Sequence, residues 1–81
     1  MKLWEKKKEG IVILAIEGRL DAQTAPLFEE QVMPMLDGAE KNFLLDLARL
    51  DYISSAALRR LLVLAKRVEG KGGRVALLSL Q

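Results

Sequence analysis

Two adjacent serines, Ser54 and Ser55, are the side chains whose type and position best fit covalent chemistry in this 81-residue chain. Only five side chains carry a hydroxyl group, and these two stand together where a loop is predicted to enter a helix. A serine at a helix start commonly accepts a hydrogen bond from a free N–H of the first turn. A cap needs only one serine, so we expect the second to face solvent.

The functional alternative to capping is that Ser55 accepts a phosphoryl group. A helix N-terminus stabilises anions through its free N–H groups and its dipole. Arg59 follows Ser55 by four residues, close enough on a helix to contact a phosphate. The formal net charge is 13 − 11 = +2, and a phosphate would add about −1.5 to −2. Spacing alone leaves capping and phosphorylation both open.

Composition excludes several classes of function. The chain has no His and no Cys, which excludes Cys/His zinc sites, Ser-His-Asp triads, Cys-His pairs and disulfides. A net charge of +2 is too small for a strong field towards nucleic acid, so we expect no direct nucleic-acid partner. The apolar runs at 11–16 and 61–65 are far shorter than the ~20 residues that span a bilayer. Without membrane insertion or a signal peptide, the expected location is the cytoplasm.

The elements that position the serines follow from the hydrophobic pattern. Residues 1–8 predict an edge strand and Glu9-Gly10 a hairpin turn. Residues 11–16, apolar and rich in β-branched side chains, predict a central strand covered on both faces and closed by Gly18.

A first helix is predicted from near Asp21 or Thr24, with Thr24 as its cap and Pro26 in the first turn. Because a proline inside a helix removes a hydrogen bond and clashes with the preceding turn, Pro34 should kink or end this helix near Met33, with a last turn to Leu36. Its core side is predicted from apolar residues at helical spacing: Ala25, Phe28, Val32 and Leu36.

The second half of the chain predicts a strand–helix–strand unit. Residues 42–48 form a strand, 49–53 a loop, 54–69 a helix and 74–80 a strand, with a right-handed crossover that makes the two strands parallel. A wide buried stripe is expected on this helix from Ala57, Leu58, Leu61, Leu62, Ala65 and Val68. The predicted fold is α/β, a mixed four-stranded sheet with two main helices, in a single domain over residues 1–81.

An ordered set of short motifs resembles the STAS domain, and more narrowly the bacterial anti-sigma factor antagonists (anti-anti-sigma factors). The motifs are Gly18-Arg19-Leu20-Asp21, Thr24-Ala25-Pro26, Leu45-Asp46-Leu47, Asp51-Tyr52-Ile53-Ser54-Ser55-Ala56-Ala57-Leu58-Arg59 and Gly72-Gly73 before a strand. Their order and spacing match the family pattern over nearly the whole chain.

The resemblance implies a non-enzymatic regulatory protein without cofactor or metal. In this family the antagonist binds an anti-sigma factor that is also a serine kinase, the kinase phosphorylates the serine at the helix start, and a phosphatase resets the switch. The phosphoacceptor of the family falls on Ser55. The implied partner-binding surface comprises Asp21, Thr24, Ser54, Ser55, Ala56 and Arg59.

Two departures from the family pattern bear on these expectations. Ala57 stands where the family usually has Gly, so the backbone there should have less freedom. Family members also usually continue past the fourth strand with further helices, so residues 1–81 are expected to be a C-terminally shortened domain. Apolar surface left open there favours self-association, which predicts a homodimer through that surface.

Two other functions fit parts of the pattern. The first is a STAS subunit or domain that docks in a membrane-transport complex through the same helix start, without a kinase. The second is a small carboxylate enzyme or receiver domain, in which Asp21, Asp46 and Asp51 gather around a metal ion. The second lacks the adjacent acidic pair that receiver domains carry after their first strand.

Overall fold

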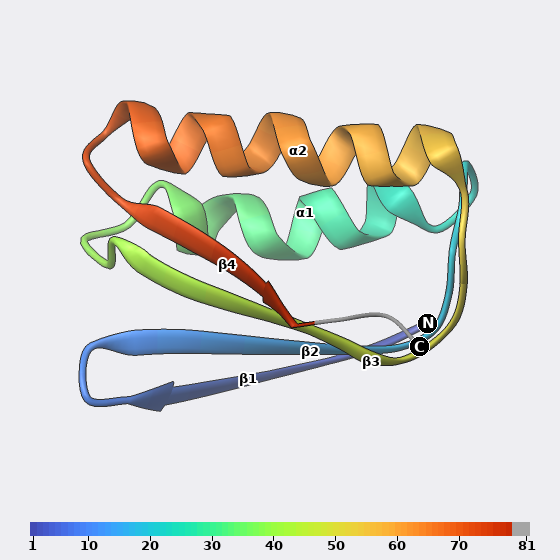
Figure 1. Ribbon diagram of the computed structural model, residues 1–81, viewed down its shortest axis with the longest axis horizontal. Coiled ribbons are helices and arrows are strands. Elements are labelled where there is room, and N and C mark those ends of the chain that lie inside the picture. The colour runs from blue at the N-terminus through green and yellow to red at the C-terminus, as the bar shows by residue number, and fades with distance from the viewer. Residues whose placement is uncertain (79–81) are drawn as a thin grey trace.

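Both parallel strand pairs of the protein depend on helical crossovers. The computed structural model describes residues 1–78, with the elements β1 (Lys2–Lys8), β2 (Ile11–Leu20), α1 (Ala25–Leu36), β3 (Asn42–Ile53), α2 (Ser55–Gly70) and β4 (Arg74–Leu78). The strands form one sheet in the order β1-β2-β3-β4 (Figure 1). β1 is antiparallel to β2, and β3 is parallel to both β2 and β4. The predicted α/β fold is confirmed.

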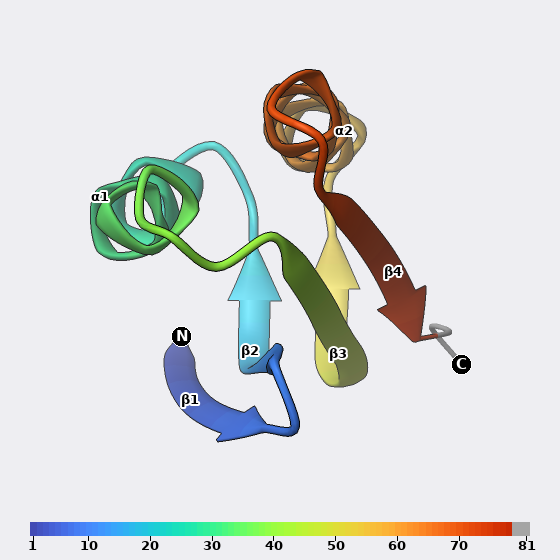
Figure 2. The same cartoon turned by 90° about the vertical axis from the view of Figure 1, so that its left-hand side faces the viewer.

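The two helices lie on the same face of the sheet (Figure 2). The crossovers β2-α1-β3 and β3-α2-β4 advance in the same direction across the sheet, so a shared right hand places both helices on one side. Val12, Leu14 and Ile16 of β2 are buried beneath them. The prediction that this strand is covered on both faces is wrong, because Ile13 is half-buried and Ile11 is 41% exposed.

Two strands are longer than predicted. β2 does not close at Gly18, and the predicted loop at 49–53 is the second half of β3. The extensions pair with each other, from Glu17 with Arg49 to Leu20 with Ile53, after register shifts that interrupt the alternation of side chains. Gly18 lies at such a shift with φ +102°, a backbone conformation that favours glycine. Polar side chains and irregular register concealed this pairing in the sequence.

Helix α1 has the predicted extent and core side. Its buried residues are the four predicted ones, and Pro26 lies in its first turn. The helix continues through Pro34 to Leu36, so the last turn is present as predicted, but the helix does not end near Met33, and Asp37 is its C-cap. Thr24 occupies the N-cap position, but its side chain makes no capping hydrogen bond, so that part of the prediction is wrong.

The buried stripe of α2 is narrower than predicted. Leu58 and Leu62 are 36% and 49% exposed, whereas Leu64, outside the predicted stripe, is buried. One flank of α2 contacts α1 through the Arg60–Glu29 and Arg67–Asp37 ion pairs. The other flank, which carries the two exposed leucines, has no neighbouring helix within residues 1–78. β4 is described to Leu78, so the last two residues of the predicted 74–80 strand lie outside the described part.

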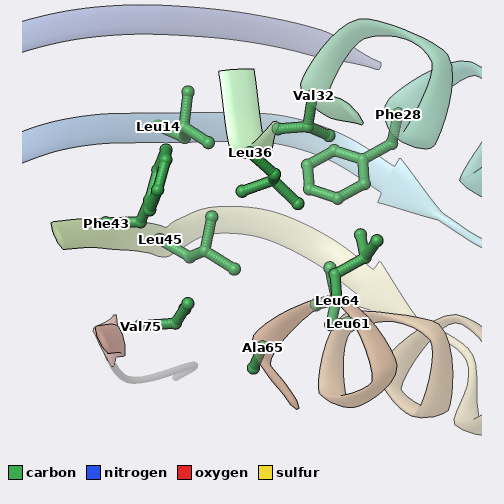
Figure 3. Close-up of a pocket in the computed structure, with 10 residues that line it drawn as sticks. All are labelled: Leu14, Phe28, Val32, Leu36, Phe43, Leu45, Leu61, Leu64, Ala65 and Val75. Carbon is green, nitrogen blue, oxygen red and sulfur yellow. The ribbon is translucent and has the colours of Figure 1, made fainter. Parts of the chain in front are cut away.

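The space between the helices and the sheet is an apolar interior. Figure 3 shows side chains from both helices and from three strands converging on it. Its free volume is only about 10 Å³, room for at most one water, which would find no polar partners there. Its lining residues are Leu14, Phe28, Val32, Leu36, Phe43, Leu45, Leu61, Leu64, Ala65 and Val75. This space is a packed core, so the functional site must lie on the surface.

Candidate functional site

The two serines have different roles at the start of α2. Ser54 is the N-cap, with extended backbone (φ −77°, ψ 158°), and its Oγ accepts a hydrogen bond of 3.0 Å from the N–H of Ala57. Ser55 is the first helical residue and is exposed. The expected division, one serine as cap and one facing solvent, is thus present, with Ser54 as the cap.

The start of α2 is also electropositive. The N–H of Leu58 donates to the Ser54 carbonyl and that of Ala57 to the Ser54 side chain. The N–H groups of Ser55 and Ala56 precede any helical acceptor, so the end retains the partial positive charge of a helix N-terminus. Arg59 lies one turn later, is exposed, and has no ion-pair partner within residues 1–78. These groups can stabilise an anion on Ser55.

Ala57 fits this helix start without strain. It is 1% exposed, so its methyl group packs into the core while its N–H meets the cap. The backbone is right-handed helical at this position, and a glycine is not needed for it.

Asp21 and Thr24 form a closed turn before α1. One carboxylate oxygen of Asp21 accepts hydrogen bonds from the N–H groups of Gln23 (3.0 Å) and Thr24 (3.1 Å). The Thr24 hydroxyl donates to the Arg19 carbonyl and accepts from the Asp21 N–H, both at 2.9 Å. The backbone N–H groups of Thr24 and Gln23 hold the pKa of Asp21 below its ordinary value. The Thr24 hydroxyl is therefore already engaged within its own turn.

The structure brings two connections together, from β2 to α1 and from β3 to α2, at the edge of the sheet where both strands reach their carboxyl ends. The carboxyl ends of parallel strands lie at the same edge, and here Leu20 of β2 pairs with Ile53 of β3. The N–H of Ser54 donates to the Leu20 carbonyl at 2.9 Å, which ties the two loops directly. Figure 1 shows both strand-to-helix connections side by side at the right of the molecule. We call this surface, formed by residues 19–24 and 51–59, the serine edge.

Two residues of the serine edge were missed by the sequence reasoning. The Arg19 guanidinium lies 4.4 Å from the centre of the Tyr52 ring, a cation–π contact, and its Nε is 3.7 Å from the Asp21 carboxylate. Tyr52 is 45% exposed. Arginine and tyrosine are among the residues that contribute most at protein interfaces. Their positions inside the two motifs that flank the edge were the available signal.

The acidic pocket of the alternative function is not formed. Within residues 1–78 no three acidic side chains are close enough to hold a metal ion. The Asp21 carboxylate is bound in its turn, and that of Asp46 accepts the N–H of Ala48. In the same part of the chain, neither helix has the length and apolar character that crossing a membrane requires.

Comparison with known proteins agrees with this arrangement of loops and helices. Residues 5–81 match the family described as the STAS domain. The chain belongs to the STAS domain family. It is 37% identical to BtrV of Bordetella bronchiseptica, a candidate anti-sigma factor antagonist, over 81 residues. The alignment covers all of this chain and 70% of BtrV. The resemblance to the anti-sigma factor antagonists is confirmed.

Solved structures of this family have the same fold. A candidate anti-sigma factor antagonist from Thermotoga maritima superposes with a TM-score of 0.84 at 26% identity, over 93% of this STAS chain and 65% of that one. SpoIIAA in its unphosphorylated form gives 0.76 at 18% identity, over 94% and 71%. The phosphorylated form of SpoIIAA from Bacillus gives 0.73 at 17% identity, over 91% and 68%. The STAS chain thus spans about two thirds of these proteins, and the expectation of a shortened single domain stays a prediction.

Proposed function

We propose that this STAS protein binds an anti-sigma factor with serine kinase activity and is released from it when the kinase phosphorylates Ser55. A phosphatase that removes the phosphate restores binding. The protein then acts as a regulatory binding module rather than an enzyme, and it controls sigma-dependent transcription from the cytoplasm, where sigma factors act.

One observation carries the proposal: Ser54 satisfies the helix cap, which leaves the exposed Ser55 hydroxyl free for chemistry. A kinase can reach this oxygen without opening the fold. The product phosphate would lie at a helix N-terminus, one turn before Arg59, where its charge is stabilised in the free protein.

The same phosphate opposes a partner that fits the neutral surface. Burial of a doubly charged group without new donors costs several kcal/mol, and each 1.4 kcal/mol weakens binding tenfold. In the free protein the helix start and Arg59 stabilise the phosphate, which further raises the free energy of the complex relative to the separated proteins. Both effects favour release after phosphorylation.

The proposed contact surface is the serine edge. It includes the predicted residues Asp21, Thr24, Ser54, Ser55, Ala56 and Arg59, together with Arg19 and Tyr52. Asp21 supports it by holding the turn before α1 and by its ion pair with Arg19. Thr24 supports it through the same turn, since its hydroxyl is engaged there.

The decisive experiment uses the cognate anti-sigma kinase and ATP, with the product read by intact mass and fragment analysis. We expect one added phosphate on the wild type and on Ser54→Ala, and none on Ser55→Ala. In a binding assay without ATP, Ser55→Ala should retain wild-type affinity and Ser55→Asp should lose at least tenfold.

Phosphate on Ser54, or phosphate on Ser55→Ala, would refute the assignment of the acceptor. If Ser55→Asp binds as tightly as the wild type, the switch is refuted, and docking in a membrane-transport complex without a kinase becomes the better account. Catalytic turnover of a small substrate by the purified chain would contradict the non-enzymatic role.

We also propose a homodimer through the flank of α2 and the edge strand β4. Leu58, Leu62 and Leu77 are 36%, 49% and 44% exposed along this side, and the outer edge of β4 is unpaired within residues 1–78. A second copy placed by two-fold symmetry would cover both. Sedimentation equilibrium should show a dimer that Leu62→Lys weakens. The control Val63→Lys changes an equally exposed position further round the helix and should leave the dimer intact. A monomer at about 100 µM (an order-of-magnitude concentration for a specific dimer) would refute the proposed dimer.

A further inference from the structure

The sheet face opposite the helices, which we call the open face, is apolar at its centre. In β2 the residues that alternate with the buried core point to this face: Ile11, Ile13 and Ala15. The register places Leu44 of β3 beside Ile13, and Ala76 of β4 beside Leu44. No element within residues 1–78 covers this surface (Figure 2).

Basic side chains border this apolar centre. The alternate positions of the edge strand β1 that share the open face are Lys2, Lys6 and Lys8, paired with Glu17, Ile13 and Ile11. On the β3–β4 side, Arg74 is paired with Asn42, and Arg49 is paired with Glu17.

None of these five cations forms an ion pair within residues 1–78. Arg19, further along β2 on the same face, forms an ion pair with Asp21. The carboxylates beside the five unpaired cations are Glu9, Glu17 and Asp46, so five positive charges outnumber three negative ones. The positive border is therefore available to a partner.

One end of the open face is hollowed into a groove of about 490 Å³. Ile11, Leu44 and Ala76 contribute apolar lining, and Arg74 lies at its side. The remaining lining residues are Glu9, Asn42, Phe43 and Val75. The groove lies at the amino ends of β3 and β4, opposite the serine edge, so a ligand there would not compete with contacts to Ser55.

We propose that the open face binds an amphipathic helix of another protein, with an apolar stripe flanked by acidic residues. Alternate residues of β1 are about 6.8 Å apart along the strand, and residues i and i+4 of a helix are about 6 Å apart along its axis. A helix lying along β2 would therefore place successive acidic residues against the lysines of β1. Its apolar stripe would cover Ile11, Ile13 and Leu44.

The charge of the face selects this occupant over others. A second copy packed face to face by two-fold symmetry would bring the lysines of β1 against either the same lysines or the Arg74 side of the other copy, and like charges repel. Single-stranded nucleic acid binds through stacking platforms of successive aromatic side chains. On this face Trp4 beside Ala15 and Tyr52 beside Arg19 lie on different strands, β1 and β3, and each ring already contacts an arginine guanidinium. A membrane surface needs a continuous protruding apolar surface, whereas the central Ile13, Ala15 and Leu44 are half-buried. The exposed apolar side chains of this face, Trp4, Ile11 and Leu78, lie on three different strands.

Trp4, the only tryptophan of the chain, reports directly on this surface. It lies on the open face beside Ala15, is 43% exposed, and contacts the Arg49 guanidinium at 5.7 Å. The probe is an 18-residue designed helical peptide with a leucine stripe and glutamates on both flanks; its controls carry lysines in place of the glutamates or the same residues in scrambled order.

We expect the acidic peptide to shift Trp4 emission to shorter wavelength, saturably, and to perturb the amide resonances of β1 and β2 but not those of the serine edge. Affinity should fall at least tenfold in Lys6→Glu/Lys8→Glu and should be unchanged in Lys66→Glu, a matched reversal on the exposed face of α2. The lysine-flanked peptide should bind the double variant. Thermal unfolding of each variant verifies that the fold is intact.

Equal binding of acidic and basic peptides, or no perturbation of the open face at 1 mM peptide (a bound of order 10⁻³ M on Kd), would overturn the proposal. So would binding of vesicles of phosphatidylserine and phosphatidylcholine that Lys6→Glu/Lys8→Glu abolishes, or self-association that the same variant abolishes. The Ser55→Asp variant should bind the peptide like the wild type, so failure of the phosphorylation switch and failure of this proposal are separate results.

Discussion

Replacement of Ser54 by alanine should destabilise the protein even though the serine makes only one side-chain hydrogen bond within residues 1–78. Its Oγ accepts from the N–H of Ala57, a residue that is 1% exposed. Loss of an N-cap hydroxyl costs about 0.5–2 kcal/mol. Because water has poor access to the Ala57 N–H after the change, we expect the upper half of that range, about 1–2 kcal/mol. For a domain of this size, 1 kcal/mol lowers Tm by about 4–8 °C.

Urea and thermal unfolding followed by circular dichroism measure this loss, and neighbouring variants isolate its cause. Ser54→Asp retains an acceptor and adds a negative charge at the helix N-terminus, so its stability should stay within about 0.5 kcal/mol of the wild type. Ser55→Ala changes an exposed side chain and should also stay within about 0.5 kcal/mol. A larger loss in Ser55→Ala than in Ser54→Ala would refute the assignment of cap and free hydroxyl.

Three further changes test other parts of the structure. Glu9 has φ +52° in the hairpin turn, so Glu9→Asn should raise the free energy of unfolding by about 1 kcal/mol in urea titrations, since asparagine tolerates this conformation better; a loss would contradict it. A Cβ on Gly73 would lie 2.3 Å from the Lys41 carbonyl oxygen, whereas one on Gly70 meets nothing within 4 Å. Gly73→Ala should therefore lower Tm, at a cost of at least about 1–3 kcal/mol, while Gly70→Ala should be neutral or stabilising by up to about 1 kcal/mol. The pKa of Asp21 in the folded protein lies below its unfolded value. The ionised carboxylate therefore contributes fully to the free energy of unfolding above about pH 4, and this contribution is lost as the pH falls towards the folded pKa. The stability difference between wild type and Asp21→Asn should shrink over that fall, and a constant difference from pH 7 to pH 2 (about two units below the ordinary Asp pKa) would contradict this origin.

Local signals predicted most of the architecture. The core residues of α1, with Pro26 in its first turn, follow from helical spacing and from the fixed φ of proline. The Glu9-Gly10 turn and the Gly72-Gly73 segment stand at the junctions that the sequence indicated. Each of these features depends on residues close in sequence, so the pattern was sufficient.

Predictions that depended on distant partners were less accurate. The sequence pattern indicates a strand end and a loop where the second halves of β2 and β3 lie, because each of these segments is stabilised by the other across register shifts. Helical spacing predicts Leu58 and Leu62 in the core, because it shows which residues share a face of the helix and not how far the neighbouring layer extends; both are exposed. Arg19 and Tyr52 meet only because their strands pair.

The amino-acid sequence alone determined the order and type of the elements, the family, and the choice of two serines at one helix start. Which serine is the cap was decided by the backbone at Ser54, where the extended conformation turns the hydroxyl towards the Ala57 N–H. The serine edge was likewise decided by tertiary structure, since parallel pairing of β2 and β3 brings Leu20 and Ser54 into hydrogen-bond contact. The open face exists because two crossovers of the same hand place both helices on the other side of the sheet.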